Sequence, residues 1–282
     1  MGFNLENLGQ WSDEKEFKVE ADRAKAYAAA TNDDVPSHAG GEIAPPIFAV
    51  VPVWEAMGSA TAQVVSPDVL PMVVHGEQDI TFHRPIRPGS VLLSKAAPVG
   101  VHVKPSGTTV VAKTETRDEG GTLVNEQYFT TFIRGVSEGD SKGEAAPDHK
   151  FPEEVRTGDP VATVTQQIDS DQTFRYSDAS GDLMPMHLDE DFARSVGLPG
   201  IIIHGLCTMA FTSHAVIKGV CEGDTERLKR LAVRFSRPVL PGQQITTTIW
   251  DAGERDGHKV YAFETVNPDG DLVIKDGLAE VS

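Results

Sequence analysis

The sequence feature that most constrains the fold of this chain is a repeat. The pattern Asp-x-x-Pro-x-His occurs at residues 33–38 (DDVPSH) and again at residues 182–187 (DLMPMH), 149 positions further along. Tyr27 and Tyr176 precede the two copies at the same shift. A period near 150 residues is too long for a solenoid repeat and has the length of a whole domain.

A second match supports a duplication. ITFHRPIRPG at residues 80–89 aligns with VRFSRPVLPG at residues 233–242, at a shift of 153 positions. In each half, helix-favouring segments precede long β-rich runs that are separated by turn signals. The sequence therefore predicts an α+β protein with two copies of one fold, each a long helix wrapped by an antiparallel sheet.

Composition changes mark the boundaries of the two copies. Residues 136–150 are polar, Gly-rich and almost free of large apolar side chains, which is typical of a linker. We therefore predict a first unit at 1–135, a linker at 136–152 and a second unit at 153–282. The expected helices are 21–31, 51–65, 169–181 and 205–220, and the expected strands are 76–85, 90–103, 108–118, 122–135 and four runs after residue 229.

Charge and composition exclude several classes of protein. The formal net charge of −17 argues against general nucleic-acid binding, but a local basic patch could still hold an anionic ligand. No apolar run approaches the roughly 18 residues of a membrane helix. The start of the chain has no signal-peptide pattern and the two cysteines have no metal spacing, so we expect a cytoplasmic protein. The basic candidates are Arg84, Arg87, Lys229, Arg230, Arg234 and Arg237.

The second copy of the motif lies in a longer stretch, YSDASGDLMPMHLDEDFARSVGLPGIIIHGLC, at residues 176–207. This stretch resembles the signature of the MaoC-like (R)-specific enoyl-CoA hydratases. HGEQ at 75–78, followed by RPIRPG, is similar to the two-domain form, the hydratase 2 component of peroxisomal multifunctional enzymes. The resemblance extends over essentially the whole chain and implies a double hot-dog fold.

The resemblance also implies an activity. It is the reversible hydration of trans-2-enoyl-CoA to (R)-3-hydroxyacyl-CoA in fatty acid metabolism, including beta-oxidation. An acyl-CoA thioester is then the substrate, no cofactor or metal is needed, and the double hot-dog chain is expected to form a homodimer. The length and bulk of the acyl group are left open by the sequence.

The chemistry of this reaction can be assigned to residues. Hydration needs a base for the water, a proton for the α-carbon and stabilisation of the enolate oxygen. Asp182 and His187 are five positions apart with Pro185 between them, so a folded loop could bring both to one water. Gly205 follows His204 at the start of a predicted helix, where a backbone N–H can bind an oxyanion. The resemblance assigns the same three roles to Asp182, His187 and Gly205.

One position departs from the family pattern, because Met184 stands where the family has asparagine. An amide can orient a carboxylate or hold a water, and a thioether does neither well. Residues that we expect to contact the substrate are His204, Met184, Arg84, Arg237, His75 and Gly76.

The first copy of the motif is expected to be an inactive relic. Asp33 and His38 remain, but no His-Gly follows at the next helix. We expect this copy to lie in a surface loop, and the first half, including Trp54, to wall the acyl pocket. Two alternatives stay open: a hot-dog acyl-CoA thioesterase, and a non-catalytic acyl-CoA binding protein that tolerates Met184.

Overall fold

The computed structural model describes residues 3–282, and the chain divides into two compact units. Unit 1 comprises Met1–Lys18, Pro52–Arg84 and Ser90–Asp148, and unit 2 comprises Val19–Val51, Pro85–Gly89 and His149–Ser282. The predicted boundaries at 1–135, 136–152 and 153–282 follow the repeat in the sequence and stay a prediction. The compact units follow packing instead, so the first copy of the motif lies in unit 2.

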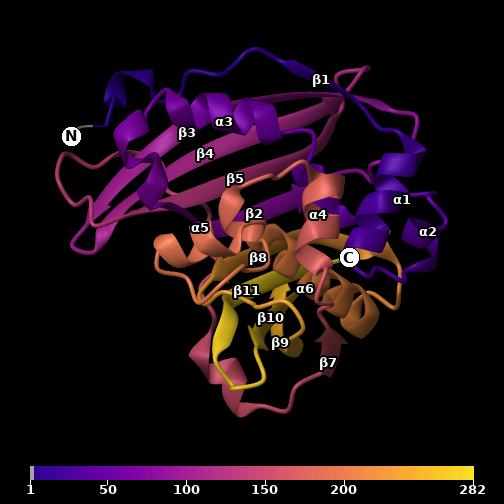
Figure 1. Ribbon diagram of the computed structural model, residues 1–282. Coiled ribbons are helices and arrows are strands. Elements are labelled where there is room, and N and C mark those ends of the chain that lie inside the picture. The colour runs from indigo at the N-terminus through magenta and orange to yellow at the C-terminus, as the bar shows by residue number, and fades with distance from the viewer. Residues whose placement is uncertain (1–2) are drawn as a thin grey trace. The chain divides into compact units, whose positions relative to one another are not determined.

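The strands of unit 1 pair antiparallel in the order β1-β3-β4-β5-β2 (Figure 1). The short β6 pairs with β3. The helix α3 (Trp54–Ala62) packs against β3 and β4. The strands are β1 (Lys15–Lys18), β2 (Val73–Phe82), β3 (Val91–Lys104), β4 (Gly107–Asp118), β5 (Leu123–Arg134) and β6 (Lys142–Gly143).

The helix of unit 1 is shorter than the predicted segment 51–65. Ala56 and Ala60 of α3 face Ala96 of β3, and these small side chains allow the helix to approach the sheet closely. Val64 and Val65 follow the helix and are buried in a separate apolar cluster. The β-branched residues after Ala62 thus leave the helix to join the core, which fits their weak helix propensity.

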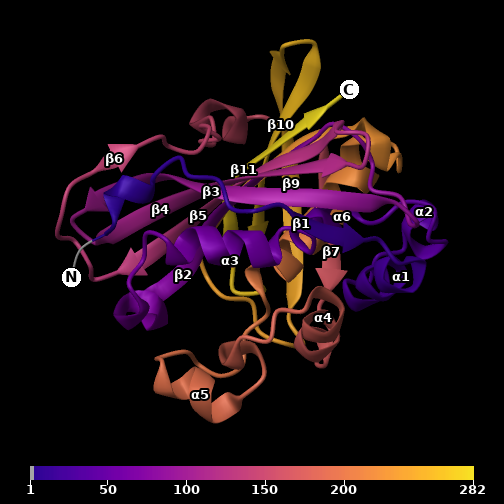
Figure 2. The same cartoon turned by 90° about the horizontal axis from the view of Figure 1, so that it is seen from above.

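The strands of unit 2 pair antiparallel in the order β8-β11-β10-β9-β7, and Figure 2 labels β7, β9, β10 and β11. The helix α6 (Gly205–Val220) coincides with the prediction, contacts β7, β8, β9 and β11, and is buried from residue 206 to residue 217. The strands are β7 (Ala162–Gln167), β8 (Leu228–Phe235), β9 (Gln244–Arg255), β10 (His258–Val266) and β11 (Leu272–Val281).

Two equivalent helices of the repeat, α1 (Ala21–Ala30) and α4 (Gln172–Ser180), pack against each other within unit 2. Tyr27 and Tyr176, which the repeat pairs at a shift of 149, meet here. Their hydroxyl oxygens lie 3.1 Å apart and their ring centroids 5.5 Å apart, and both side chains are buried. Two residues that the repeat makes equivalent thus contact each other within unit 2.

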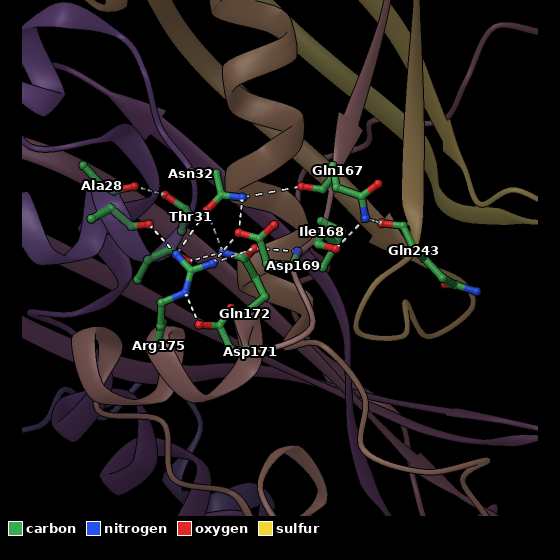
Figure 3. A network of polar contacts seen from close by, with 12 residues as sticks. Ala28, Thr31, Asn32, Gln167, Ile168, Asp169, Asp171, Gln172, Arg175 and Gln243 are labelled. Atoms are coloured by element: carbon green, nitrogen blue, oxygen red, sulfur yellow. Dashed lines mark hydrogen bonds and ion pairs between the residues drawn. The ribbon is translucent and has the colours of Figure 1, made fainter.

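A polar network joins the C-terminal end of α1 to α4 (Figure 3). Arg175 donates to Asp169 at 2.6 Å and to the side-chain oxygen of Asn32 at 3.1 Å. Asn32 in turn donates to Asp169 at 3.0 Å. The guanidinium thus joins the end of α1 to the start of α4 through a bridging carboxylate.

Several short elements were not predicted. They are β1, β6, β7, the helices α2 (Pro36–Ala39) and α5 (Glu190–Ser195), and the 3-10 helices η1 (Leu5–Asn7), η2 (Pro46–Val50), η3 (Pro67–Met72), η4 (Glu153–Thr157), η5 (Pro185–His187) and η6 (Thr225–Arg227). Among residues 3–282, no helix has the length and apolar character needed to cross a membrane.

Candidate active site

The second copy of the motif begins where α4 ends. Gly181 takes a left-handed conformation with φ of 86°, and its N–H bonds to the carbonyl of Ser177, so the chain leaves the helix at the glycine. The Asp182 carboxylate then accepts a hydrogen bond from the Met184 N–H at 3.1 Å, a local turn typical of aspartate. Pro185 starts η5, and this 3-10 helix carries His187.

Asp182 and His187 come together as predicted. One carboxylate oxygen of Asp182, one ring nitrogen of His187 and one ring nitrogen of His204 all lie within 4.8 Å of one another. Nδ1 of His187 donates to the carbonyl of Ile202 at 2.8 Å, which leaves Nε2 of the neutral ring as an acceptor. His187 is buried and Asp182 is half-buried, so this pair lies at the edge of the protein interior.

Burial dominates the electrostatics of the site. It raises the pKa of the Asp182 carboxyl, while His187 acts in the opposite direction. Burial also lowers the pKa of the His187 imidazole. Opposite shifts of this kind bring a carboxyl and an imidazole closer in basicity, which suits groups that exchange a proton with one water.

His204 supports this pair from within the protein. Its ring stacks on the His187 ring with centroids 3.7 Å apart. Nδ1 lies 3.3 Å from the Thr173 hydroxyl, and Nε2 lies 3.3 Å from the Ser177 hydroxyl and 3.2 Å from the Asp182 carbonyl oxygen. Burial, reinforced by neighbouring His187, lowers the pKa of His204 to about 3, so its ring is neutral at physiological pH.

Gly205 occupies the predicted place at the N-terminus of α6, with His204 as the N-cap residue. The first backbone N–H groups of a helix have no partner within it and carry the positive end of the helix dipole. A side chain at Gly205 would be crowded, because a Cβ there would lie 3.2 Å from the Phe235 ring. Gly205 directly follows His204, whose ring lies near Asp182 and His187.

We expect Gly205→Ala to lower kcat by about 10-fold or more while the protein stays folded. The added methyl group presses on the Phe235 ring and shifts the N–H that would bind an oxyanion, and loss of one such donor costs about 10²–10³-fold. Steady-state kinetics beside a thermal melt checks this, with Gly257→Ala in the β9–β10 turn as a stability comparison, since that position is strained for alanine but has open space around it. Unchanged kcat in Gly205→Ala would contradict the role of this glycine.

The remaining predicted site residues are placed as follows. Met184 is 46% exposed, in the loop between Asp182 and His187. Arg237 is exposed and lies 3.5 Å from the carboxylate of Asp271. In unit 1, His75 stacks on Phe129, Gly76 lies in β2, and Arg84 is exposed just after β2. Contact of these residues with a substrate stays a prediction.

The other basic candidates, which follow β2 or lie around β8, have acidic or carbonyl partners. Arg87 pairs with Glu226, Arg230 with Glu280, Arg234 with Asp276, and Lys229 donates to the Glu226 carbonyl. A CoA phosphate would therefore compete with carboxylates for most of these side chains.

The first copy of the motif is buried, and the expectation of a surface loop is wrong. The Asp33 carboxylate lies 2.7 Å from Nδ1 of His38 and 3.0 Å from Nε2 of His214, a residue of α6. Nε2 of His38 lies 2.8 Å from the Thr225 hydroxyl. The side chains of Asp33 and His38 have no exposed surface, because α6 and η6 cover them.

Asp182, His187 and His204 are also the kinds of residue that bind metals. The two nitrogens of His204, however, already lie within hydrogen-bond distance of Thr173, Ser177 and the Asp182 carbonyl. A cation would have to displace these contacts, so the donor set fits a metal poorly.

Sequence reasoning missed Thr173 and Ser177. They lie at positions i and i+4 of α4 and are fully buried, with Tyr176 between them at i+3. Polar side chains repeated at helical spacing on a buried face are a signal that sequence inspection can find.

A helix packed on an antiparallel sheet is the arrangement of a hot-dog fold, and in this protein a carboxylate and an imidazole lie near the N-terminus of that helix. Residues 151–269 match the MaoC-like domain, and residues 41–135 match the MFE-2 hydratase 2 N-terminal domain. The chain belongs to the MaoC-like family, in the two-domain form that carries both domains.

Two relatives illustrate this membership. The chain is 29% identical over 209 residues to a probable enoyl-CoA hydratase 2 of Dictyostelium discoideum, covering 74% of this chain and 69% of the relative. It is 32% identical over 193 residues to the peroxisomal multifunctional enzyme type 2 of Drosophila melanogaster. That match covers 68% of this chain but only 32% of the longer Drosophila protein.

Solved structures agree on the fold. A MaoC-like dehydratase of Phytophthora capsici is 25% identical, with a TM-score of 0.84 and 99% of both chains covered. A Mycobacterium tuberculosis protein described as having a double hotdog fold is 14% identical, with a TM-score of 0.61, and the match covers 97% of this chain and 95% of that one. The predicted α+β double hot-dog fold is therefore confirmed.

Proposed function

We propose that this protein catalyses the (R)-specific hydration of trans-2-enoyl-CoA to (R)-3-hydroxyacyl-CoA, and the reverse dehydration. The observation that carries the proposal is the arrangement of Asp182 and His187 at the N-terminus of α6. Relatives named enoyl-CoA hydratase 2 and 3-hydroxyacyl-thioester dehydratase support the reaction class.

The geometry supports a specific division of roles. A water between the Asp182 carboxylate and Nε2 of His187 gives its hydroxyl to C3 of the enoyl thioester. The pair takes up the proton that the water loses and delivers a proton to C2, so one water is added across the double bond. The developing negative charge on the thioester oxygen is stabilised by the N–H of Gly205 and the dipole of α6.

Ultraviolet absorbance tests the proposal, because hydration removes the conjugated double bond of an enoyl thioester. We expect the absorbance of at least one trans-2-enoyl-CoA, within a panel from short to long and bulky acyl chains, to fall when the protein is added. A thiol reagent run in parallel detects release of free CoA. Thiol release without hydration would favour the thioesterase alternative, and binding without either reaction would favour an acyl-CoA binding protein that carries Met184.

We also propose that the chain acts in the cytoplasm as a homodimer. Cys207 and Cys221 are buried free thiols, and burial raises the pKa of each, so both are held in the unreactive protonated form. To test the homodimer, light scattering coupled to gel filtration measures the mass of the protein in solution. We expect twice the chain mass of 30.4 kDa. A monomer at micromolar concentration would contradict the dimer.

A further inference from the structure

Three side chains on one face of α4 contact the ring of His204. Thr173, Tyr176 and Ser177 lie at positions i, i+3 and i+4, which places them side by side on the helix. The two hydroxyls of Thr173 and Ser177 contact opposite nitrogens of the imidazole, and the Tyr176 ring centroid lies 4.9 Å from the ring of His204. Both nitrogens and the ring of His204 therefore contact side chains of one helix, α4.

Thr173 reaches beyond His204 to the catalytic histidine. Its hydroxyl oxygen lies 2.9 Å from the carbonyl oxygen of His187 and 3.5 Å from the carbonyl oxygen of Ile202. The Ile202 carbonyl is the same oxygen that accepts the Nδ1 hydrogen bond of His187. The Thr173 hydroxyl thus lies within reach of three groups that position His187. They are the His187 carbonyl, the Ile202 carbonyl that accepts from the His187 ring, and the His204 ring on which His187 stacks.

We propose that Thr173 is a positioning residue of the active site. Its hydroxyl fixes the His187–His204 ring pair, so that Nε2 of His187 faces the water shared with Asp182. The side chain of Thr173 has no exposed surface, and it acts through His187 and not on the substrate. This inference rests on the proposed function, since it assigns how the base of that reaction is oriented.

Removing the Thr173 hydroxyl is expected to lower the rate of hydration, because several contacts around His187 depend on it. Valine has nearly the same shape as threonine, but it leaves the buried carbonyl of His187 without its donor. The backbone at His187 then relaxes, and a misplacement of about 1 Å in a catalytic group can cost about 10²-fold in rate. Serine keeps the hydroxyl and should keep most of the activity.

The experiment compares Thr173→Val and Thr173→Ser with Thr212→Val as a matched control. Thr212 is a fully buried threonine of α6 whose hydroxyl donates within its own helix, to the Thr208 carbonyl at 3.0 Å. We expect Thr173→Val to lower kcat by about 10- to 100-fold with KM changed less than threefold. Thr173→Ser and Thr212→Val should stay within about threefold of the wild-type kcat.

A second measurement separates positioning from loss of folding and from failure of the proposed function. In nitrogen-labelled protein, the Nδ1 proton of His187, assigned with His187→Gln, should be visible by NMR in the wild type and in Thr173→Ser. It should exchange too fast to observe in Thr173→Val, whether or not the protein hydrates enoyl-CoA. An Nδ1 proton that persists in Thr173→Val, or a kcat equal to that of Thr212→Val, would overturn the proposal.

Discussion

Replacing Asp182 by asparagine is expected to lower kcat for enoyl-CoA hydration by about 10²–10⁴-fold, the usual contribution of a positioned acid or base. Asparagine keeps the size of the side chain and can still accept the Met184 N–H bond that shapes the loop. It cannot take a proton from water. The loss should therefore appear in kcat, while the folded structure and substrate binding change little.

Asp178→Asn is the matched control for this variant. Asp178 is an exposed residue of the same helix–loop region, and its replacement removes the same charge four positions away. Circular dichroism and thermal melts should be the same for both variants, and only Asp182→Asn should lose turnover. Near-wild-type kcat in Asp182→Asn would show that this carboxylate is not the acid–base group.

The pH dependence of the wild-type enzyme tests the same pair. Because burial raises the pKa of Asp182, we expect activity to fall on the acid side at a pH above the usual carboxylate range near 4. A profile of kcat/KM against pH measures this limb, which should be absent from the residual activity of Asp182→Asn. An acid limb that is unchanged in the variant would assign it to another group.

The largest effect on stability is expected at the first copy of the motif. Replacing Asp33 by asparagine should lower the free energy of unfolding by about 3 kcal/mol, because it removes a buried carboxylate on which two buried imidazoles depend for their contacts. The Asp33 carboxylate contacts both His38 and His214, so its loss affects the loop after α1 and the helix α6 together. Urea denaturation followed by circular dichroism measures the change.

Asp34→Asn provides the control for this prediction. Asp34 is the adjacent aspartate, but its side chain is 71% exposed and pairs with Lys218 in solvent, so its loss should cost less than about 1 kcal/mol. Turnover of folded Asp33→Asn should stay close to that of wild type, since this copy has no His-Gly at a helix start. Equal stability of the two variants would contradict the structural role of the buried copy.

The pH window of this effect follows from the direction of the pKa shift. His214 and His38 outweigh the cost of burial and hold the pKa of the Asp33 carboxyl below its usual value. The stability that this carboxylate contributes is therefore complete above the unfolded pKa near 4, and it is lost as the pH falls through the lower folded pKa. The difference between wild type and Asp33→Asn should be constant from neutral pH to about pH 5 and should shrink below pH 4.

The sequence predicted the parts of the molecule that depend on local pattern or on the repeat. The bounds of α6 followed from its apolar run, and the pairing of Asp182 with His187 followed from the motif around Pro185. The contact of Tyr27 with Tyr176 involves two residues that the repeat makes equivalent, although only the structure shows that they touch.

Contacts between distant, unrelated positions could not be predicted. His214 and Thr225 bury the first copy of the motif, yet neither belongs to a recognisable pattern, and Thr225 is 187 positions from His38. The assignment of residues 19–51 to unit 2 has the same origin. Such contacts depend on how the chain packs, and the local spacing of residues contains no record of them.

The configuration of the product decides whether this protein is an (R)-specific hydratase. The protein is incubated with a trans-2-enoyl-CoA that it hydrates, the 3-hydroxyacyl product is released from CoA, and its enantiomers are separated by chiral chromatography. Asp182→Asn, treated identically, sets the background. We expect the (R)-3-hydroxyacyl product, formed only by the enzyme with Asp182 intact. An (S) product, or equal amounts from both proteins, would show that the proposed reaction or its assignment to Asp182 is wrong.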